Sequence, residues 1–350
     1  MKGTVLDFVE RYPLSREPLI RLADRAYRLG YPIMDDATFD TLADGVEVEI
    51  NDNPATDGVA VTLHPPMLSQ QKTYNYSDVT AICGKSEVLT ASLKLDGFAV
   101  SLVYEHGVLS YATTRGDGRE GLTITNHIIA GVLNIPWILD DGMAEIEKLE
   151  IRGEMIIPSS FGDAKHNPRS ICVGLFGRND LSGLDEYEPS FYGYDLLLPQ
   201  LKHEERLSTL MRLGFDVVPW IICHPSDICA IVMELEGLHE TFRFEADGIV
   251  FRINDTTIFH SKGSTQHHPK GSIALKFKTD TAITTVESID WSEGEKTGKL
   301  TPIVSVSPVT LGGCEIRKLN GGTIANTLHV GDKIQITRKG GVIPVILAKL

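Results

Sequence analysis

Residues 91–100 read ASLKLDGFAV, and this stretch decides how the chain is interpreted. Lys94 interrupts a run of apolar residues, and Asp96 and Gly97 follow closely. From residue 88 onward the hydrophobic residues alternate with a period of two, which predicts three strands with a short turn at residues 105–107. A lysine near the centre of such a strand needs an explanation, because lysine is rarely buried without a partner.

The segments after this stretch continue the strand pattern. Four further predicted strands are LEIRGEMIIP, SFYGYDLLL, ADGIVFRIN and SIALKFKT. An amphipathic helix, HEERLSTLMRLGF, lies among them and ends at Gly214. The middle of the chain is therefore predicted to be α+β and built on antiparallel sheet.

The two ends of the chain differ from the middle. REPLIRLADRAYRLG has leucines at helical spacing and a C-terminal Gly30, and a second helix is predicted to start at Asp35 or Asp36. These two helices predict a small N-terminal helical unit. In residues 281–350, short predicted strands are separated by glycine and proline turns, which indicates a small β-barrel.

The composition narrows the class of protein. With 350 residues, 42% hydrophobic and 23% charged, the chain is expected to form two or three soluble domains. A net charge of -14 argues against binding nucleic acid by bulk electrostatics alone. No apolar run suggests a membrane span, and no signal peptide is expected at the N-terminus. The five scattered cysteines favour free thiols in the cytoplasm and give no zinc-binding pattern.

Charged residues recur at similar places in the predicted strands. Lys94, Glu154, Lys276 and Lys278 each interrupt a strand, and Arg115 closes one. For any one of them alone, a solvated sheet face is the favoured explanation. Together they could converge on one face, because side chains two residues apart on a strand point the same way. The nearby Gly97, Gly153 and Gly248 are expected to let a ligand approach the backbone.

Convergence would produce a site with one reactive lysine among other cations. Neighbouring cations and partial burial favour the neutral amine, which can attack phosphorus or a carbonyl carbon. Spacing alone leaves two chemistries open, nucleotidyl transfer through a lysine adduct and Schiff-base formation. The sequence contains no G-x-x-x-x-G-K-[ST] motif, which argues against P-loop ATP chemistry.

Six motifs occur in the order seen in bacterial NAD-dependent DNA ligases: LKLDG, TRGDG, EIRGE, HNPRS, DGIVFR and ALKFK. The flanking segments resemble that family as well, since YPIMDDATFDTL and HPPMLSQ match its N-terminal landmarks and VGDKIQITRKGGVIP matches its OB-fold. The resemblance implies a helical unit at residues 1–62 that binds the nicotinamide mononucleotide (NMN) half of NAD. It further implies an antiparallel-sheet nucleotidyltransferase (adenylation) domain at 63–280 and an OB-fold β-barrel at 281–350.

The resemblance also implies roles for individual residues. Lys94 would take AMP from NAD and release NMN, with Asp96 shaping the adjoining turn and Lys276 at the AMP phosphate. The other implied NAD-binding residues are Tyr27, Asp36 and Asp40 at NMN, Ser69 at the edge of the site, Arg115 and Glu154 at ribose and phosphate, and Ser92 and Arg252. The expected DNA-binding residues are Arg169, Arg338 and Lys339. The family then seals nicked double-stranded DNA with Mg²⁺, whose ligands the sequence does not identify.

Two departures from the family pattern concern NAD binding, and a third position concerns the choice between NAD and ATP. Ser92 replaces a glutamate that usually contacts adenine, so base recognition is expected to be altered. Arg252 replaces a lysine, which changes a point charge into a planar fork. Ala99 stands where ATP-dependent ligases carry arginine, and this favours NAD over ATP.

The chain stops after the predicted barrel, whereas the family usually continues into a zinc module, a helix-hairpin-helix domain and a BRCT domain. A shortened piece, a naturally short viral enzyme and one subunit of a split ligase, completed by a second polypeptide, all stay open. The leading hypothesis is a ligase core acting in DNA replication or repair. The alternatives are a self-adenylylating fragment that seals poorly alone and a non-catalytic nucleic-acid-binding subunit with an OB-fold.

Overall fold

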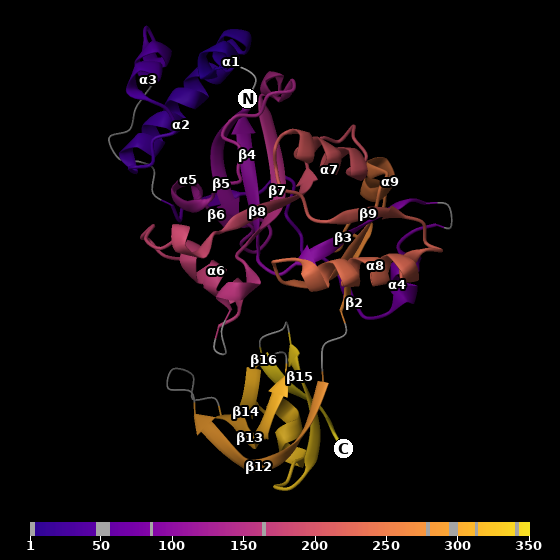
Figure 1. Cartoon of the computed structure of the whole chain (residues 1–350). Coiled ribbons are helices and arrows are strands. Elements are labelled where there is room, and N and C mark those ends of the chain that lie inside the picture. The colour runs from indigo at the N-terminus through magenta and orange to yellow at the C-terminus, as the bar shows by residue number, and fades with distance from the viewer. Residues whose placement is uncertain are drawn as a thin grey trace. The chain divides into compact units, whose positions relative to one another are not determined.

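The computed structural model describes residues 4–46, 57–84, 87–162, 166–277, 281–293, 300–311, 314–339 and 343–350. The chain forms two compact units (Figure 1). The first comprises residues 1–161 and 168–276, and the second comprises 162–167 and 277–350. The fold mixes helices and sheets, as expected for the α+β class. Within the described ranges, no helix has the length and apolar character needed to cross a membrane.

The first unit begins with three helices that share its core. They are α1 (Val5–Arg11), α2 (Arg16–Arg28) and α3 (Asp36–Ala43). The Asp35 side chain accepts a hydrogen bond from the Thr38 amide and caps α3, as the sequence predicts. Leu19 and Leu42 are buried in the same hydrophobic cluster as Leu102 of the sheet. The helices are therefore packed onto the body of the unit.

Two main sheets form the body of the first unit. The five-stranded sheet has the order β2 (Lys72–Thr73), β11 (Ser272–Lys276), β10 (Ala246–Ile253), β3 (Leu89–Leu95) and β9 (Trp220–Cys223). The four-stranded sheet has the order β5 (Val108–Thr114), β4 (Phe98–Glu105), β7 (Lys148–Ile156) and β8 (Ser190–Leu196). The described pairs are antiparallel apart from β2 with β11, which is parallel. A further short pair joins β1 (Ala60–Thr62) to β6 (Glu120–Leu122).

The remaining helices of this unit lie between the strands in sequence. They are α4 (Tyr76–Ala81), α5 (Thr125–Gly131), α6 (Pro168–Phe176), α7 (His203–Arg212), α8 (Ile228–Thr241) and α9 (Thr256–Ser261). The predicted helix at HEERLSTLMRLGF is α7, and Gly214 follows it with a φ of +90°. Positive φ suits glycine and ends the helix there.

The chain passes from one sheet to the other at Asp96 and Gly97. β3 pairs with β10 and β9, whereas β4 pairs with β5 and β7, so two consecutive strands do not form a hairpin. A Cβ atom on Gly97 would lie 2.0 Å from the Met155 carbonyl oxygen. Gly97 therefore admits another part of the protein backbone. The expectation that these glycines make room for a ligand is wrong at Gly97, and at Gly248 the Leu275 carbonyl oxygen takes the space, 2.3 Å away.

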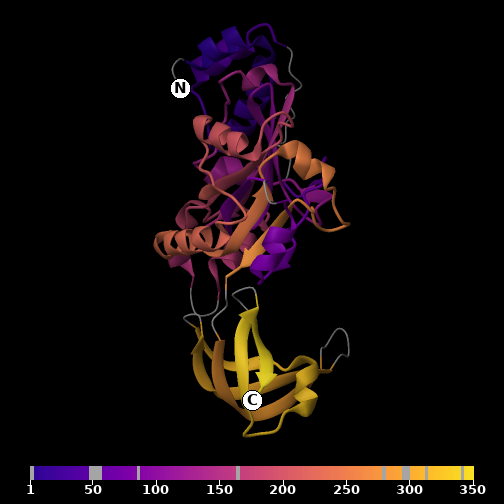
Figure 2. The same ribbon diagram turned by 90° about the vertical axis from the view of Figure 1, so that its right-hand side faces the viewer.

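The second unit is a closed five-stranded barrel, consistent with the predicted OB-fold (Figure 2). Its order is β12 (Thr281–Glu293), β13 (Leu300–Leu311), β14 (Cys314–Asn320), β16 (Ile343–Lys349) and β15 (Lys333–Lys339). Val304, Ile334 and Ile336 fill its interior. Closure leaves the barrel without a free sheet edge. The division of the sequence at 62/63 and 280/281 stays a prediction.

Candidate active site

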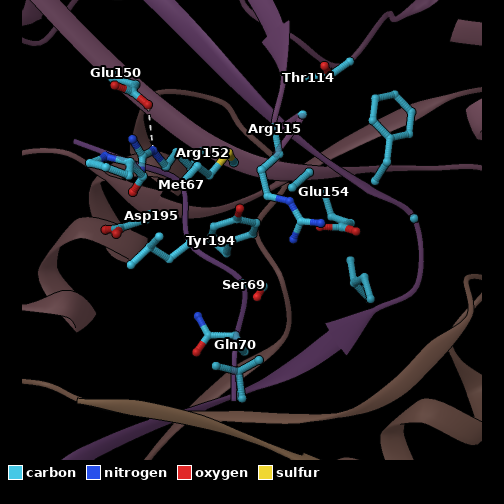
Figure 3. Close-up of a pocket in the computed structure, with 18 of the residues that line it drawn as sticks. Met67, Ser69, Gln70, Thr114, Arg115, Glu150, Arg152, Glu154, Tyr194 and Asp195 are labelled. Carbon is cyan, nitrogen blue, oxygen red and sulfur yellow. Dashed lines mark hydrogen bonds and ion pairs between the residues drawn. The ribbon is translucent and has the colours of Figure 1, made fainter. Parts of the chain in front are cut away.

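One large pocket in the first unit lies between the two main sheets. Residues of β3 and β10 line it from the five-stranded sheet, and residues of β7 and β8 line it from the four-stranded sheet. Figure 3 shows part of its lining. Eight of the residues predicted for catalysis or NAD binding line this pocket or lie at its wall: Ser69, Ser92, Lys94, Asp96, Arg115, Glu154, Arg252 and Lys276. They converge between two sheets and not on one face of a single sheet.

An aspartate that the sequence analysis did not single out connects the two lysines. Lys94 Nζ lies 3.0 Å from Asp247 Oδ1, and Lys276 Nζ pairs with Asp247 Oδ2. The strand register explains this, because Gly248 of β10 stands opposite both Lys94 of β3 and Lys276 of β11. Burial raises the pKa of Asp247, but the two lysines outweigh it and hold that pKa below its usual range. Burial lowers the pKa of Lys276.

Glu154 supplies a carboxyl group from the opposite sheet. It is on β7, opposite Ala99 of β4 and Tyr192 of β8. Burial raises its pKa to about 7, although Lys94, Arg169 and Arg115 act in the other direction. In Figure 3 the Arg115 guanidinium points toward the Glu154 carboxyl group. Near neutral pH this group therefore exists in both protonation states.

Asp96 holds an arginine at the pocket wall. Arg169, on α6, donates a hydrogen bond of 2.8 Å from Nη1 to Asp96 Oδ1. The Arg169 side chain stays 45% exposed, so it remains accessible to a ligand. This contact ties the expected DNA-binding residue directly to the turn that follows Lys94.

The segment that carries Ser69 is fastened to β7 of the four-stranded sheet and to the loop that precedes β11. The Arg152 guanidinium, on β7, donates to the carbonyl oxygens of Pro65 and Pro66 and pairs with Glu150 at 2.6 Å. The Ser69 carbonyl oxygen lies 2.9 Å from His268 Nδ1. Arg152 and His268 therefore hold this segment at two points along the wall of the pocket.

A second network of buried charges lies at another part of the pocket, and the sequence analysis did not identify it. Asp195 Oδ2 pairs with Arg252 Nη1 at 2.7 Å, and Asp195 Oδ1 pairs with Arg206 Nη1 at 2.9 Å. Arg252 also stacks on Phe259, with its guanidinium carbon 4.2 Å from the ring centroid. Burial raises the pKa of Asp195, but the arginines outweigh it and keep that pKa well below its usual range. The predicted residue Arg252 is thus held by two partners.

The residues predicted to contact NMN lie away from this pocket. Tyr27 of α2 is 64% exposed, and Asp36 and Asp40 are exposed on α3. None of these three residues belongs to the pocket lining. Their assignment to NMN stays a prediction.

The structure leaves two other expectations open. The side chains of Arg338 and Lys339, at the end of β15, lie outside the described part of the structure, as does Lys278. Among the described residues, no group of three His, Cys, Asp or Glu side chains is arranged to hold a metal ion.

Comparison with known proteins gives a consistent picture. A family model described as NAD-dependent DNA ligase adenylation domain matches residues 55–280. A DNA ligase of Acinetobacter baylyi is 31% identical over 323 residues, which cover 82% of this chain and 47% of that protein. DNA ligase 1 of Nocardia farcinica is 30% identical over 95% of this chain and 55% of that protein. The solved structure titled Pmar-Lig_PreS3 is 12% identical, with a TM-score of 0.49, over 91% of this chain and 72% of that chain.

Proposed function

Because this chain belongs to the NAD-dependent DNA ligase family, we propose that it adenylylates itself from NAD and passes the AMP to nicked double-stranded DNA. The chain spans about half the length of the curated relatives it matches. The complete sealing activity and the DNA substrate are therefore part of the proposal.

The arrangement of Lys94, Asp247 and Lys276 is the observation that supports this function most strongly. In the proposed first step, Lys94 Nζ loses a proton and attacks the phosphorus of the adenylyl group. A phosphorus–nitrogen bond forms, the bond to the NMN phosphate oxygen breaks, and NMN leaves. Lys276, fixed beside Lys94 by their common partner Asp247, places a cation where charge develops on the phosphoryl oxygens.

The later steps follow the chemistry of the family. The 5′-phosphate at the nick displaces Lys94 from the AMP phosphorus, and the 3′-hydroxyl then displaces AMP. Arg169, 45% exposed at the pocket wall, is a candidate contact for the DNA phosphate. The described residues do not gather a metal-binding cluster, and Asp247 is already paired with two lysines. Mg²⁺, a second polypeptide and a cytoplasmic location stay predictions, and no step above depends on them.

Incubation with NAD labelled in its adenylate half, followed by a denaturing gel, tests the proposal. We expect covalent label on the wild-type chain and none on Lys94→Ala, because a methyl group cannot replace the amine nucleophile. Labelled ATP should give little product. Label on Lys94→Ala at the wild-type rate would show that Lys94 is not the nucleophile.

The same gel separates the alternatives. A non-catalytic nucleic-acid-binding subunit, or a Schiff-base enzyme, would take no label from NAD. A labelled chain that fails to seal nicked DNA would be a self-adenylylating fragment. A nick-sealing assay on the labelled chain distinguishes that fragment from a working ligase core.

A further inference from the structure

The charges of the Asp195, Arg206 and Arg252 side chains do not sum to zero. His203 lies beside them, with its Nδ1 2.6 Å from the Thr90 hydroxyl and its Nε2 2.9 Å from the Tyr194 carbonyl oxygen. Burial and the charge of Arg252 lower the pKa of His203 to about 3, so this histidine is neutral. One carboxylate and two guanidinium groups remain, which leaves one positive charge. Uncompensated buried charge is costly and therefore suggests a role in binding.

The network also contains a donor without a partner. Arg252 Nε is buried and has no hydrogen-bond partner within the described part of the chain. Asp195 is only 6% exposed, and both residues line the pocket. Because Phe259 and Asp195 hold the guanidinium from two sides, its orientation is fixed. Arg252 Nε and the Asp195 carboxylate therefore form a recognition edge, by which we mean one fixed hydrogen-bond donor beside one fixed acceptor.

This edge lies at a defined distance from the proposed reaction centre. On β10, Gly248 stands opposite Lys94 and Arg252 stands opposite Thr90. Four residues along a strand span about 13 Å. That is the length scale of a nucleoside with its 5′-phosphate. With the phosphate at Lys94, the base reaches toward Arg252 and Asp195.

The Tyr194 ring provides a surface for such a base. Tyr194 lines the pocket next to Asp195 in sequence, and in the view of Figure 3 its ring lies between Asp195 and the pair Arg115 and Glu154. Aromatic rings stack on bases of any identity, so stacking alone does not select among them. Selection needs hydrogen bonds to the base edge. Ser92, on the opposite sheet, offers a hydroxyl and no charge.

We propose that Asp195, oriented by Arg206 and Arg252, is the residue that selects adenine as the base of the dinucleotide. This inference rests on the proposed function. Adenine presents an amino donor at position 6 next to an acceptor at N1, whereas hypoxanthine presents an acceptor at O6 next to a donor at N1. Asp195 accepts from the amino group, and Arg252 donates to a ring nitrogen. With hypoxanthine, the O6 oxygen would face the Asp195 carboxylate, and the two acceptors would repel.

The test compares NAD with nicotinamide hypoxanthine dinucleotide. Both dinucleotides release NMN on transfer to Lys94, so NMN release gives one readout for both. We expect the wild-type protein to prefer NAD by about tenfold to a hundredfold in kcat/KM, the range for a hydrogen bond to a charged group. Asp195→Asn should reduce that preference by about tenfold, because the amide can donate to O6.

Two further variants are measured beside Asp195→Asn, one as a control and one as a second test of the network. Glu150→Gln removes another carboxylate that lines the pocket and pairs with an arginine, and it should leave the preference unchanged. Arg252→Lys keeps the charge but loses the fork, and it should also reduce the preference. If Asp195→Asn does not fold, Arg252→Lys decides the question.

Each outcome has a distinct meaning. If the wild-type protein releases NMN from neither dinucleotide, the proposed function fails and this inference fails with it. If the wild type uses both dinucleotides equally well, the inference alone is wrong. If Asp195→Asn slows both reactions by the same factor, Asp195 has only a structural role, and the inference is again wrong.

Discussion

Glu154 carries a carboxyl group whose protonation in the folded protein differs from that in the unfolded chain. Its pKa in the fold is raised to about 7 from 4.5, mainly by burial. Between these two values the folded protein binds the extra proton, so the free energy of unfolding falls as pH rises from about 4.5 to 7. The stability that protonated Glu154 contributes is complete below this window and lost above it.

Glu154→Gln should remove this pH dependence. Glutamine is uncharged throughout, so the variant should lose less stability between pH 5 and pH 8 than the wild type does. The difference between the two proteins should be at most about 3 kcal/mol. Urea unfolding of both proteins at pH 5 and pH 8 measures it. Identical losses would mean that Glu154 titrates normally in the fold.

The sequence predicted which charged residues would gather, but not how they would be paired. Lys94, Glu154 and Lys276 were visible because each interrupts an apolar strand. Asp247 stands inside a quoted motif, yet its role depends on Gly248 lying opposite two strands at once, which no local pattern reveals. Ser92 predicted altered base recognition, and Arg252 predicted a changed charge geometry. Asp195 was missed because its partner Arg252 is far away in sequence.

At the scale of elements, β7 positions the segment that precedes the site. Arg152 on this strand holds the carbonyl oxygens of Pro65 and Pro66 and pairs with Glu150, and all of these contacts are partly or fully buried. Without the guanidinium, both carbonyl groups would lose this donor, and the Glu150 carboxylate would keep the Ser101 hydroxyl but lose its ion pair. The segment that carries Ser69 would then lose its contact with β7 and keep the one with His268.

Arg152→Met should lower the free energy of unfolding by about 3 kcal/mol, as expected when one partner of a buried ion pair is removed. It should also raise the KM for NAD, because the segment that precedes Ser69 would lose its contact with β7. The matched control is Arg243→Met, which breaks an exposed pair with Glu188 and should cost less than about 1 kcal/mol. Similar losses in the two variants would mean that Arg152 does not anchor the loop.

The strands themselves were predictable, but their assignment to sheets was not. The period-two pattern from residue 88 predicted β3, β4 and β5 with the turn at 105–107. Consecutive strands most often pair with each other. Here the close approach of the Met155 carbonyl oxygen to Gly97 directs β4 into the second sheet. That contact involves a residue almost sixty positions away, so the sequence gives no local signal for it.

At the scale of the molecule, the N-terminal helices belong to the core of the first unit. Leu19, Leu22 and Leu42 are buried with the sheet residues, so deleting residues 1–62 would expose that core. A deletion would therefore confuse loss of NAD binding with loss of folding. Substitutions of exposed residues give a cleaner test of the proposed NMN contacts.

Tyr27→Ala should slow transfer from NAD about tenfold, which corresponds to the loss of one stacking contact. Asp36→Asn combined with Asp40→Asn should raise the KM for NAD, because the nicotinamide ring is cationic. Since all three side chains are exposed, the urea midpoint should stay within error of the wild type. Tyr74→Ala, which removes another exposed tyrosine, is the control. Wild-type rates in Tyr27→Ala would exclude this face as the NMN contact.

The distribution of charge over the whole chain leads to a prediction about DNA. The net charge is -14, but residues 281–350 hold eight Lys and Arg against six acids. Binding to a nicked duplex should therefore be weak and should depend on a few basic positions. Each phosphate contact contributes about -0.9 to the slope of log K against log salt.

Arg338→Ala combined with Lys339→Ala should flatten this slope by about 2, because two phosphate contacts are lost. Nick sealing should slow, whereas adenylylation from NAD should stay near the wild-type rate, since every residue proposed for that step belongs to the first unit. Lys333→Ala, at the other end of β15, is the matched control and should leave the slope unchanged. Salt titrations of the three proteins between 50 and 200 mM, about the range over which such contacts change affinity measurably, provide the measurement. Equal slopes in the wild type and the double variant would mean that DNA binds elsewhere, and Arg169 would then be the next position to test.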